Sequence, residues 1–381
     1  MICSGIDVAT GNPITLEFDQ LISKVEPSDP GSDRYLAPGW IDIQVNGYAG
    51  VDYNNPAIAH SEISRSIHAL VKTGVTRFFP TVITGSPDDM LGALRNLYAA
   101  KQQIEEGTVI EGIHVEGPYI GAEDGPRGAH PRQWVRPPDL EEWKRWRDAT
   151  HGLIRLVTLS PHWEEAPRYI ETLVAEGVTI SIGHTGATAE QLDAAVQAGA
   201  TLSTHLGNGA HAILRRHPNY IWDQLANDRL TADFIVDGIH LPASFLKVAL
   251  RAKTVERSVL VTDASAPAGA AFGRYQLGEQ AVDHLPDGRV VLADSDKLAG
   301  SGLRMDHGVE NLMRLGGLSL RDSVQLATVN PARVTKIPNR QRGLAEGDRG
   351  DIIVFRFDEQ TQKIQIEATY IDGRCYFAAA A

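Results

Sequence analysis

Two hydrophobic periods alternate along most of this chain. Short β-branched runs stand between stretches in which apolar residues recur every three or four positions. Ile63, Ile67, Leu70 and Val71 follow the helical period, whereas residues 109–115 form a nearly continuous apolar run. The helical spacing predicts amphipathic helices, and continuous apolar runs are typical of strands that are buried on both faces. Strands and helices are therefore expected to alternate from residue 40 to about residue 263.

Eight strands are expected in this alternating region. Gly74, Gly177 and Gly199 each follow a helical stretch and precede a strand, which is the C-cap position. Eight strand–helix units predict a closed (β/α)₈ TIM-like barrel, and a doubly wound open sheet is the structural alternative. The expected strands are Trp40–Val45, Arg77–Ile83, Val109–Glu116, Leu153–Ser160, Val178–His184, Thr201–Leu206, Ala232–Gly238 and Ser258–Asp263.

The two ends of the chain follow a different pattern. Residues before Pro38 are short, polar and β-like, and Asp351–Phe355 and Ile364–Tyr370 read as strands of an antiparallel sheet. Ser319–Thr328 is expected to be a helix that leads back to this sheet. We expect the ends to pair into a small β-sandwich domain, with residues 1–37 and 340–381 in that domain and 38–339 in the barrel.

Composition and charge narrow the functional classes. The 381 residues are 43% hydrophobic and carry a net charge of −12, so nucleic acid and anionic membrane surfaces are poor partners. No apolar run is long enough to span a membrane, and the pattern of residues 1–20 leads us to expect no signal peptide. Cys3 and Cys375 form no Cys-x-x-Cys pair, which favours a reducing, cytoplasmic setting. No G-x-G-x-x-G motif supports a dinucleotide cofactor.

Polar side chains stand where several expected strands end. Glu116, His184, His205 and Asp263 occupy four such ends, and a barrel directs strand ends into one pocket. Two imidazoles and a carboxylate suit a catalytic zinc ion, which keeps one position open for water. Asp263 could then act as general base and acid. Each residue alone has a structural explanation, as a core histidine, an ion-pair partner or a helix N-cap, but the combination favours a metal-dependent hydrolase.

Short motifs occur in a fixed order between residues 37 and 355. They are Pro38–Asp42, His114–Tyr119, Gly183–Thr185, Thr204–Asn208, Asp237–His240, Val261–Gly269, Leu298–Ser301 and Asn330–Ala332. Each motif is weak alone, but the ordered set resembles the N-acetylglucosamine-6-phosphate deacetylases of the amidohydrolase superfamily.

The resemblance implies a role for each site residue. Glu116, His184 and His205 would hold one divalent metal ion, expected to be Zn²⁺, and Asp263 would be the catalytic acid and base. His130 would hold and polarise the small-molecule substrate, an amino sugar. A homodimer is expected, because family members complete part of the phosphate site from a neighbouring subunit. The other implied substrate contacts are Ala129, Asn208, Gly209, Arg216, His240, Leu298, Ala299 and Gly300, with Arg216 on the phosphate.

Three departures from the family pattern affect metal number and specificity. Gln44 and Asn46 replace the His-x-His pair that holds a second metal in many amidohydrolases, and one tightly held metal is expected because amides are poor zinc ligands. The segments around Gly207–Ala210 and after Arg216 also differ, which leaves the sugar and the 6-phosphate requirement open. The alternatives are another N-acetyl amino sugar, another amidohydrolase reaction such as cyclic amide opening or D-aminoacyl hydrolysis, or a non-catalytic sugar-binding protein.

Overall fold

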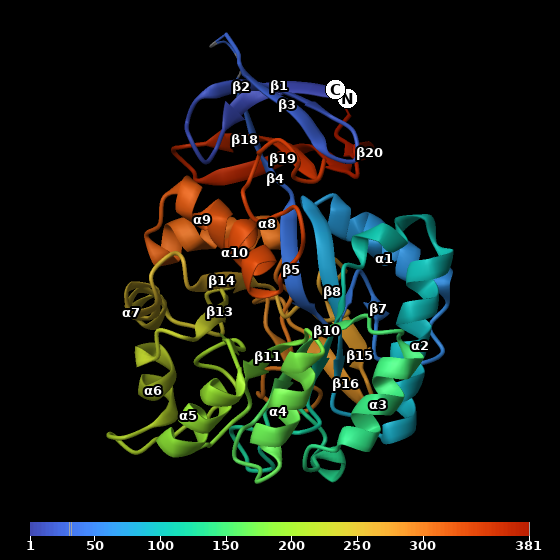
Figure 1. The fold of residues 1–381 in the computed structure, drawn as a ribbon, viewed down its shortest axis with the longest axis vertical. Coiled ribbons are helices and arrows are strands. Elements are labelled where there is room, and N and C mark those ends of the chain that lie inside the picture. The colour runs from blue at the N-terminus through green and yellow to red at the C-terminus, as the bar shows by residue number, and fades with distance from the viewer. Residues whose placement is uncertain (30, 32, 381) are drawn as a thin grey trace.

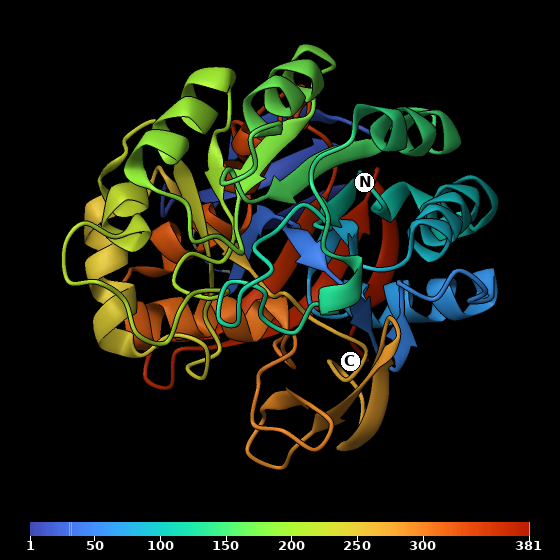
Figure 2. The same ribbon diagram turned by 90° about the horizontal axis from the view of Figure 1, so that it is seen from below.

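A (β/α)₈ barrel forms most of the molecule, as expected. The structure is a computed structural model that describes residues 1–29, 31 and 33–380. Eight parallel strands are hydrogen-bonded in the order β14-β13-β12-β11-β10-β9-β8-β5, and Figure 2 shows helices around them. The strands are β5 (Trp40–Val45), β8 (Val75–Ile83), β9 (Ile113–Glu116), β10 (Ile154–Leu159), β11 (Thr179–Ile182), β12 (Leu202–Ser203), β13 (Thr231–Ile235) and β14 (Ser258–Val261).

The ring closes where β14 meets β5. Val45 and Ala264 form a parallel bridge there. The Thr262 hydroxyl donates a 2.5 Å hydrogen bond to Asp42, whose carboxylate also accepts the Thr262 backbone N–H. Burial raises the pKa of Asp42 to about 7 in spite of these bonds. The seam therefore ties the first and last strands together directly below Asp263.

The helices between the strands carry local signals that explain where they begin and end. Helix α5, for example, begins with a capping box between Thr188 and Gln191 and ends at Gly199, which has a φ of 114°. The helices are α1 (His60–Val71), α2 (Pro87–Gln103), α3 (Leu140–Ala149), α4 (Ala166–Ala175), α5 (Ala189–Ala198), α6 (Tyr220–Ala226), α7 (Ala243–Lys253), α8 (Met305–Asn311), α9 (Leu320–Ala327) and α10 (Val329–Val334), with the shorter turns η1 (Glu105–Val109), η2 (Arg132–Trp134) and η3 (Leu312–Gly316).

Six barrel strands, β9 to β14, are shorter than the sequence predicts, and β9 and β12 differ most from the predicted bounds. Strand β9 begins at Ile113, because Glu105–Val109 forms the 3₁₀ turn η1. A Cβ on Gly107 would lie 2.0 Å from the Lys101 carbonyl oxygen, so the chain turns tightly there. Strand β12 pairs only through Leu202 and Ser203, since the chain leaves the sheet before His205. The predicted helix Ser319–Thr328 is present as α9, with Ser319 as its N-cap.

The chain termini form the expected small β domain as one continuous sheet. It has the order β20-β19-β18-β4-β1-β2-β3 and folds over a core that contains Leu16 and Ile352. Figure 1 shows it at one end of the molecule, next to α9 and α10. Its strands are β1 (Ile2–Asp7), β2 (Pro13–Phe18), β3 (Ile22–Pro27), β4 (Arg34–Pro38), β18 (Ile352–Asp358), β19 (Lys363–Ile371) and β20 (Arg374–Ala378).

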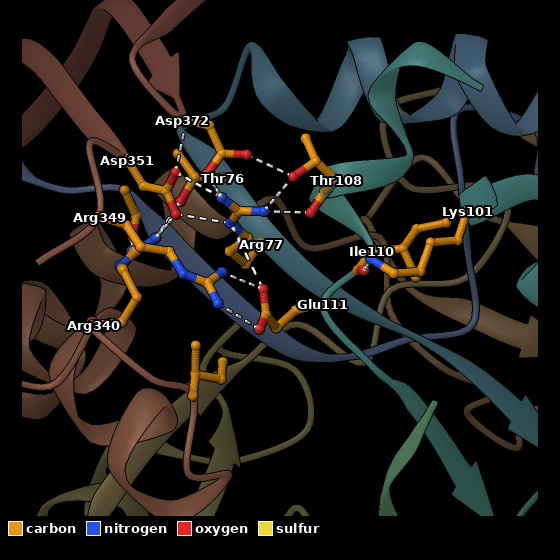
Figure 3. Close-up of polar contacts among 12 residues, drawn as sticks. Thr76, Arg77, Lys101, Thr108, Ile110, Glu111, Arg340, Arg349, Asp351 and Asp372 are labelled. Atoms are coloured by element: carbon orange, nitrogen blue, oxygen red, sulfur yellow. Dashed lines mark hydrogen bonds and ion pairs between the residues drawn. The ribbon is translucent and has the colours of Figure 1, made fainter. Parts of the chain in front are cut away.

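A buried ion-pair network joins this sheet to the barrel (Figure 3). Arg77 at the start of β8 donates hydrogen bonds of 2.8 and 2.9 Å to the two carboxylate oxygens of Asp351. Arg340 also contacts Asp351, and it donates a 2.6 Å bond to the Gly39 carbonyl oxygen. Burial opposes the charge on Asp351, but the two guanidinium groups outweigh it and hold the pKa of this carboxyl well below its usual range. The small domain is therefore fixed at the amino ends of β5 and β8.

An insertion after β14 was not predicted from the sequence. Strands β15 (Gly273–Leu277), β16 (Gln280–His284) and β17 (Val290–Leu292) form a separate antiparallel sheet, seen as the orange hairpin that projects from the ring in Figure 2. A two-stranded ribbon, β6 (Gly47–Tyr48) with β7 (Val51–Asp52), precedes α1. Over the described part of the chain, no helix has the length and apolar character that a membrane span requires.

Candidate active site

Three site residues follow their strands in an unusual backbone conformation. His184, His205 and Asp263 have φ values of 50°, 29° and 50°, in a region that residues other than glycine rarely adopt. Such strain persists where surrounding contacts enforce it, and it concentrates at functional sites. The backbone N–H of His205, for instance, donates a 2.5 Å hydrogen bond to the buried carboxylate of Asp233. The backbone after β11, β12 and β14 therefore adopts a conformation that orients the side chains of these three residues.

Glu116 lies at the centre of these strand ends. The Nε2 atoms of His184 and His205 lie 3.1 and 2.9 Å from the same carboxylate oxygen, Oε1. All three side chains are buried. Two ligands of one tetrahedral zinc ion lie roughly 3.4 Å apart, given bonds of about 2.1 Å. The spacing of these three polar atoms thus fits a shared cation.

The second nitrogen of His184 supports the same interpretation. Its Nδ1 lies 2.7 Å from the carbonyl oxygen of Pro126, which can only accept, so the proton is on Nδ1. In the neutral ring, Nε2 then presents a lone pair to a carboxylate oxygen, an arrangement that needs a positive charge between them. A backbone carbonyl behind a histidine is also a common partner for metal-binding imidazoles. Gly209 leaves room for this ring, because a Cβ there would lie 2.7 Å from Nδ1.

Electrostatics favours positive charge at this point. Burial opposes a charged His205, but the hydrogen bond and charge of Glu116 outweigh it and raise the pKa of His205 to about 9. Burial likewise opposes the charge on Glu116, yet the contacts with His184 and His205 lower the pKa of Glu116 well below its ordinary value. A proton or a metal ion can supply the positive charge that the site stabilises.

His130 adds a further ring next to this cluster. The ligand atoms of Glu116, His130 and His184 lie within 4.8 Å of one another, and His130 Nδ1 lies 2.8 Å from the Thr84 hydroxyl. Burial, followed by the charge of His184, lowers the pKa of His130 to about 3. His130 is therefore neutral near pH 7. Glu116 and His184 are common to both possible ligand sets, with either His205 or His130 as the third member.

Asp263 is held through one of its two oxygens. Its Oδ1 accepts hydrogen bonds of 3.1 Å from Gln44 and 2.7 Å from Asn46, and Gln44 also donates a 2.9 Å bond to Glu116. Among the described residues, none donates to Oδ2 of Asp263. Burial, then the charge of Glu116, raises the pKa of Asp263 to about 6. One oxygen is thus fixed and the other is open, which suits a group that exchanges protons near neutral pH.

A pocket of about 290 Å³ surrounds these groups. Most of the residues predicted from the sequence line it, but two do not. Ala299 is buried in a small apolar core behind the pocket, and Arg216 lies on an exposed loop outside the lining. The predicted residues that line the pocket are Glu116, Ala129, His130, His184, His205, Asn208, Gly209, His240, Asp263, Leu298 and Gly300.

Some lining residues were missed in the sequence. Leu277 reaches the pocket from the β15–β16 hairpin, and Lys297 lies just before the Leu298–Gly300 stretch. The signal for the hairpin was present as two alternating runs on either side of Gly278-Glu279. The signal for Lys297 was its position next to a motif that had already been identified. His240, in contrast, was predicted, and its Nδ1 is held 2.6 Å from Asp237.

Comparisons with known proteins show which family this sequence resembles. The model of the family described as "Amidohydrolase family" matches residues 35–375. N-acetylglucosamine-6-phosphate deacetylase from Bacillus subtilis is 32% identical over 88% of this chain and 86% of its own, and the one from Mus musculus is 32% identical over 97% and 89%.

Solved structures extend the similarity to the whole fold. The N-acetyl-D-glucosamine-6-phosphate deacetylase of Mycobacterium smegmatis has a TM-score of 0.88 at 30% identity, and covers 98% of this chain and 99% of its own. A mutant of that enzyme in complex with N-acetyl-D-glucosamine-6-phosphate has a TM-score of 0.86 at 30% identity, with coverage of 96% and 94%.

Proposed function

Since the chain belongs to the amidohydrolase family, and within it to the N-acetylglucosamine-6-phosphate deacetylases, which hydrolyse amide bonds, we propose that it is a metal-dependent deacetylase of N-acetylglucosamine-6-phosphate. The products would be acetate and glucosamine-6-phosphate. The observation that carries the proposal is the approach of two imidazole Nε2 atoms to one oxygen of Glu116 beside Asp263. This arrangement unites a cation site and a proton-exchanging group in one pocket.

Glu116, His184 and His205 are proposed to hold one divalent metal ion, Zn²⁺. When bound, such an ion supplies Lewis acidity, which polarises a carbonyl group and makes water nucleophilic near neutral pH. The carbonyl of Pro126 orients His184 for this role. Gln44 and Asn46 donate to Glu116 and Asp263 instead of binding a second metal, so one ion per chain is expected.

Asp263 is proposed to move the proton. Its free oxygen, Oδ2, would take a proton from the water that attacks the acetyl carbonyl, and would then give it to the departing nitrogen. The pKa of about 6 suits both halves of this exchange, because efficient acid–base groups titrate near the operating pH. The bonds from Gln44 and Asn46 keep the carboxylate in one orientation during the transfer.

His130 is proposed to stabilise the oxyanion that forms on the acetyl group. The ring is neutral at pH 7, and the Thr84 hydroxyl, as a donor to Nδ1, would place the ring proton on Nε2. A pre-oriented neutral donor in a buried site stabilises developing negative charge without reorganisation. This role distinguishes His130 from the three proposed metal ligands.

The remaining contacts are proposed from their positions around the pocket. Ala129, Asn208, Gly209, His240, Leu298 and Gly300 would contact the sugar, with Ala299 supporting Leu298 and Gly300. Because Arg216 lies outside the pocket of its own chain, it would reach a phosphate only from a second copy, which is consistent with a homodimer. A cytoplasmic setting is part of the proposal, and Cys3 and Cys375 are unpaired.

The test is release of free amine by zinc-loaded protein from N-acetylglucosamine-6-phosphate and from N-acetylglucosamine. Faster release from the phosphorylated sugar is expected. Release from the unphosphorylated sugar alone would favour the alternative substrate, another N-acetyl amino sugar. Release from neither sugar would overturn the assignment of the substrate class, and cyclic amides and N-acyl-D-amino acids would then be tested.

A further inference from the structure

The charges around the pocket are unevenly distributed. Glu116 and Asp263 stand at its inner end, and among the described residues that line it Lys297 is the one lysine or arginine. A phosphate dianion is attracted to the ammonium group of this lysine. We propose that Lys297 is a specificity-determining residue that binds the phosphate of the substrate within the same subunit. This inference rests on the proposed function and names a residue that the sequence motifs do not assign.

The backbone of Lys297 is held in place. Its carbonyl oxygen accepts a 2.8 Å hydrogen bond from the Leu292 N–H, and its own N–H donates a 3.1 Å bond to the Ser295 hydroxyl. Further along the same segment, the Ser301 N–H donates a 2.8 Å bond to the Asp263 carbonyl oxygen. Lys297 and Asp263 are therefore connected through a short segment whose two ends are fixed by hydrogen bonds.

The length of this segment suits a phosphorylated sugar. Gly300 lies against Asp263, since a Cβ on Gly300 would be 3.1 Å from the Asp263 carbonyl oxygen. Three residues of extended chain, from Lys297 to Gly300, span at most about 10 Å. The Lys297 backbone therefore lies within that distance of Gly300, and its flexible side chain covers the remaining adjustment.

The ammonium group of Lys297 is available to a ligand. Within the described residues its only ionic partner is Asp124, at 4.0 Å, which is too long for a hydrogen bond. Asp124 is 81% exposed and already contacts Arg127, so it competes weakly. Lysine binds phosphate as a point charge, and no fixed geometry is needed for it to contact the ligand.

The loop of Asp124 also borders the pocket, close to Lys297. Gly125 and Gly128 from this loop line the pocket together with Lys297. A phosphate placed between them would face the backbone of the loop on one side and the ammonium on the other. Arg216, in contrast, is exposed and does not line the pocket of its own chain. Within one subunit, Lys297 is therefore the residue whose charge can distinguish a phosphorylated sugar.

The experiment compares wild type, Lys297→Met and Lys297→Arg on N-acetylglucosamine-6-phosphate and N-acetylglucosamine, with the zinc-loaded enzyme. Lys297→Met should raise KM for the phosphorylated sugar about tenfold, because the variant loses a hydrogen bond between a charged group and the phosphate. It should leave kcat and the reaction of the unphosphorylated sugar unchanged. Lys297→Arg should keep most of the preference. Lys247→Met, on the exposed face of α7, is the matched control and should change nothing.

An unchanged KM in Lys297→Met would overturn the inference, as would a phosphate preference that Arg216→Met alone removes. Calorimetric titration with glucosamine-6-phosphate and with glucosamine separates this result from the proposed function, because it needs no turnover. If wild type hydrolyses neither sugar, the proposed function fails. The phosphate-binding role of Lys297 would still be supported if glucosamine-6-phosphate bound more weakly to Lys297→Met than to wild type. Equal binding to the two proteins would reject that role.

Discussion

Asn46 donates a 2.7 Å hydrogen bond to Oδ1 of Asp263 and so fixes one carboxylate oxygen while the other stays open. The two residues follow the first and last strands of the barrel, whose seam is closed by Asp42 and Thr262. The position that binds metal through histidine in many amidohydrolases thus serves here to orient the proposed acid–base group.

Asp263→Asn should lose turnover and keep the metal. The amide has nearly the same size, but it cannot take a proton from water, so kcat should fall by about 10²- to 10⁴-fold with KM and bound zinc unchanged. Steady-state kinetics and elemental analysis of the same preparation measure this. Asp228→Asn, at an exposed ion pair with Arg257, is the control. A kcat within a few-fold of wild type would remove Asp263 from the mechanism.

His205→Ala and His130→Ala should have different effects on the metal. If His205 is the third ligand, its removal should leave protein that purifies with little zinc and binds it weakly. His130→Ala should keep one zinc per chain and lose turnover. Elemental analysis after gel filtration distinguishes the two residues, and the reverse pattern would assign the ligand role to His130, whose nearest ring atom also lies close to Glu116 and His184.

Thr84→Val should reduce kcat without altering metal content. The two side chains have similar shape, but valine cannot bond to His130 Nδ1, so the ring loses the contact that fixes its proton. A neutral hydrogen bond is worth about 0.5–1.5 kcal/mol, which corresponds to at most about a tenfold loss in kcat. Thr84→Ser should restore the rate. Equal kcat values for the valine and serine variants would contradict the proposed role of this contact.

Asp351→Asn should destabilise the protein by about 3–5 kcal/mol at pH 7, because Arg77 and Arg340 would be left buried without a counter-charge. The folded-state pKa of Asp351 is lowered, so its contribution is present above the unfolded value of about 3.9 and is lost as pH falls through the lower, folded value.

Urea unfolding of wild type and Asp351→Asn at several pH values tests this pH dependence of the stabilisation by Asp351. The difference in free energy of unfolding between the variant and wild type should be constant between pH 5 and pH 8 and should become smaller below about pH 4. Asp372→Asn should destabilise the protein less, because this carboxylate is 32% exposed and Arg77 still has Asp351 as a counter-charge. A difference that grows in acid would show that the network does not act as described.

The sequence predicts most of the barrel because its strands are buried on both faces. Strand β5 has the predicted bounds, Trp40–Val45. Residues 109–112 were wrongly predicted as part of a strand. An apolar run does not show where the strand begins after the tight turn at Gly107. The β15–β17 insertion was missed because its strands are half exposed and lie outside the strand–helix repeat.

The site was predictable wherever a residue type and a strand end coincide, as for Glu116, His184 and Asp263. Sequence alone could not show that Gln44 bridges Glu116 and Asp263, because this contact depends on three strands meeting in the closed ring. It also could not show that Arg216 lies outside the pocket, since an arginine in a long loop has no fixed direction until the loop folds.

The most direct test of the account is the rate of acetate release from N-acetylglucosamine-6-phosphate as zinc is added back to chelator-treated protein. The account predicts negligible activity without metal and a linear rise that ends at one zinc per chain, because one carboxylate and two imidazoles form a single site. Activity that is independent of metal, or that saturates only at two ions per chain, would contradict it.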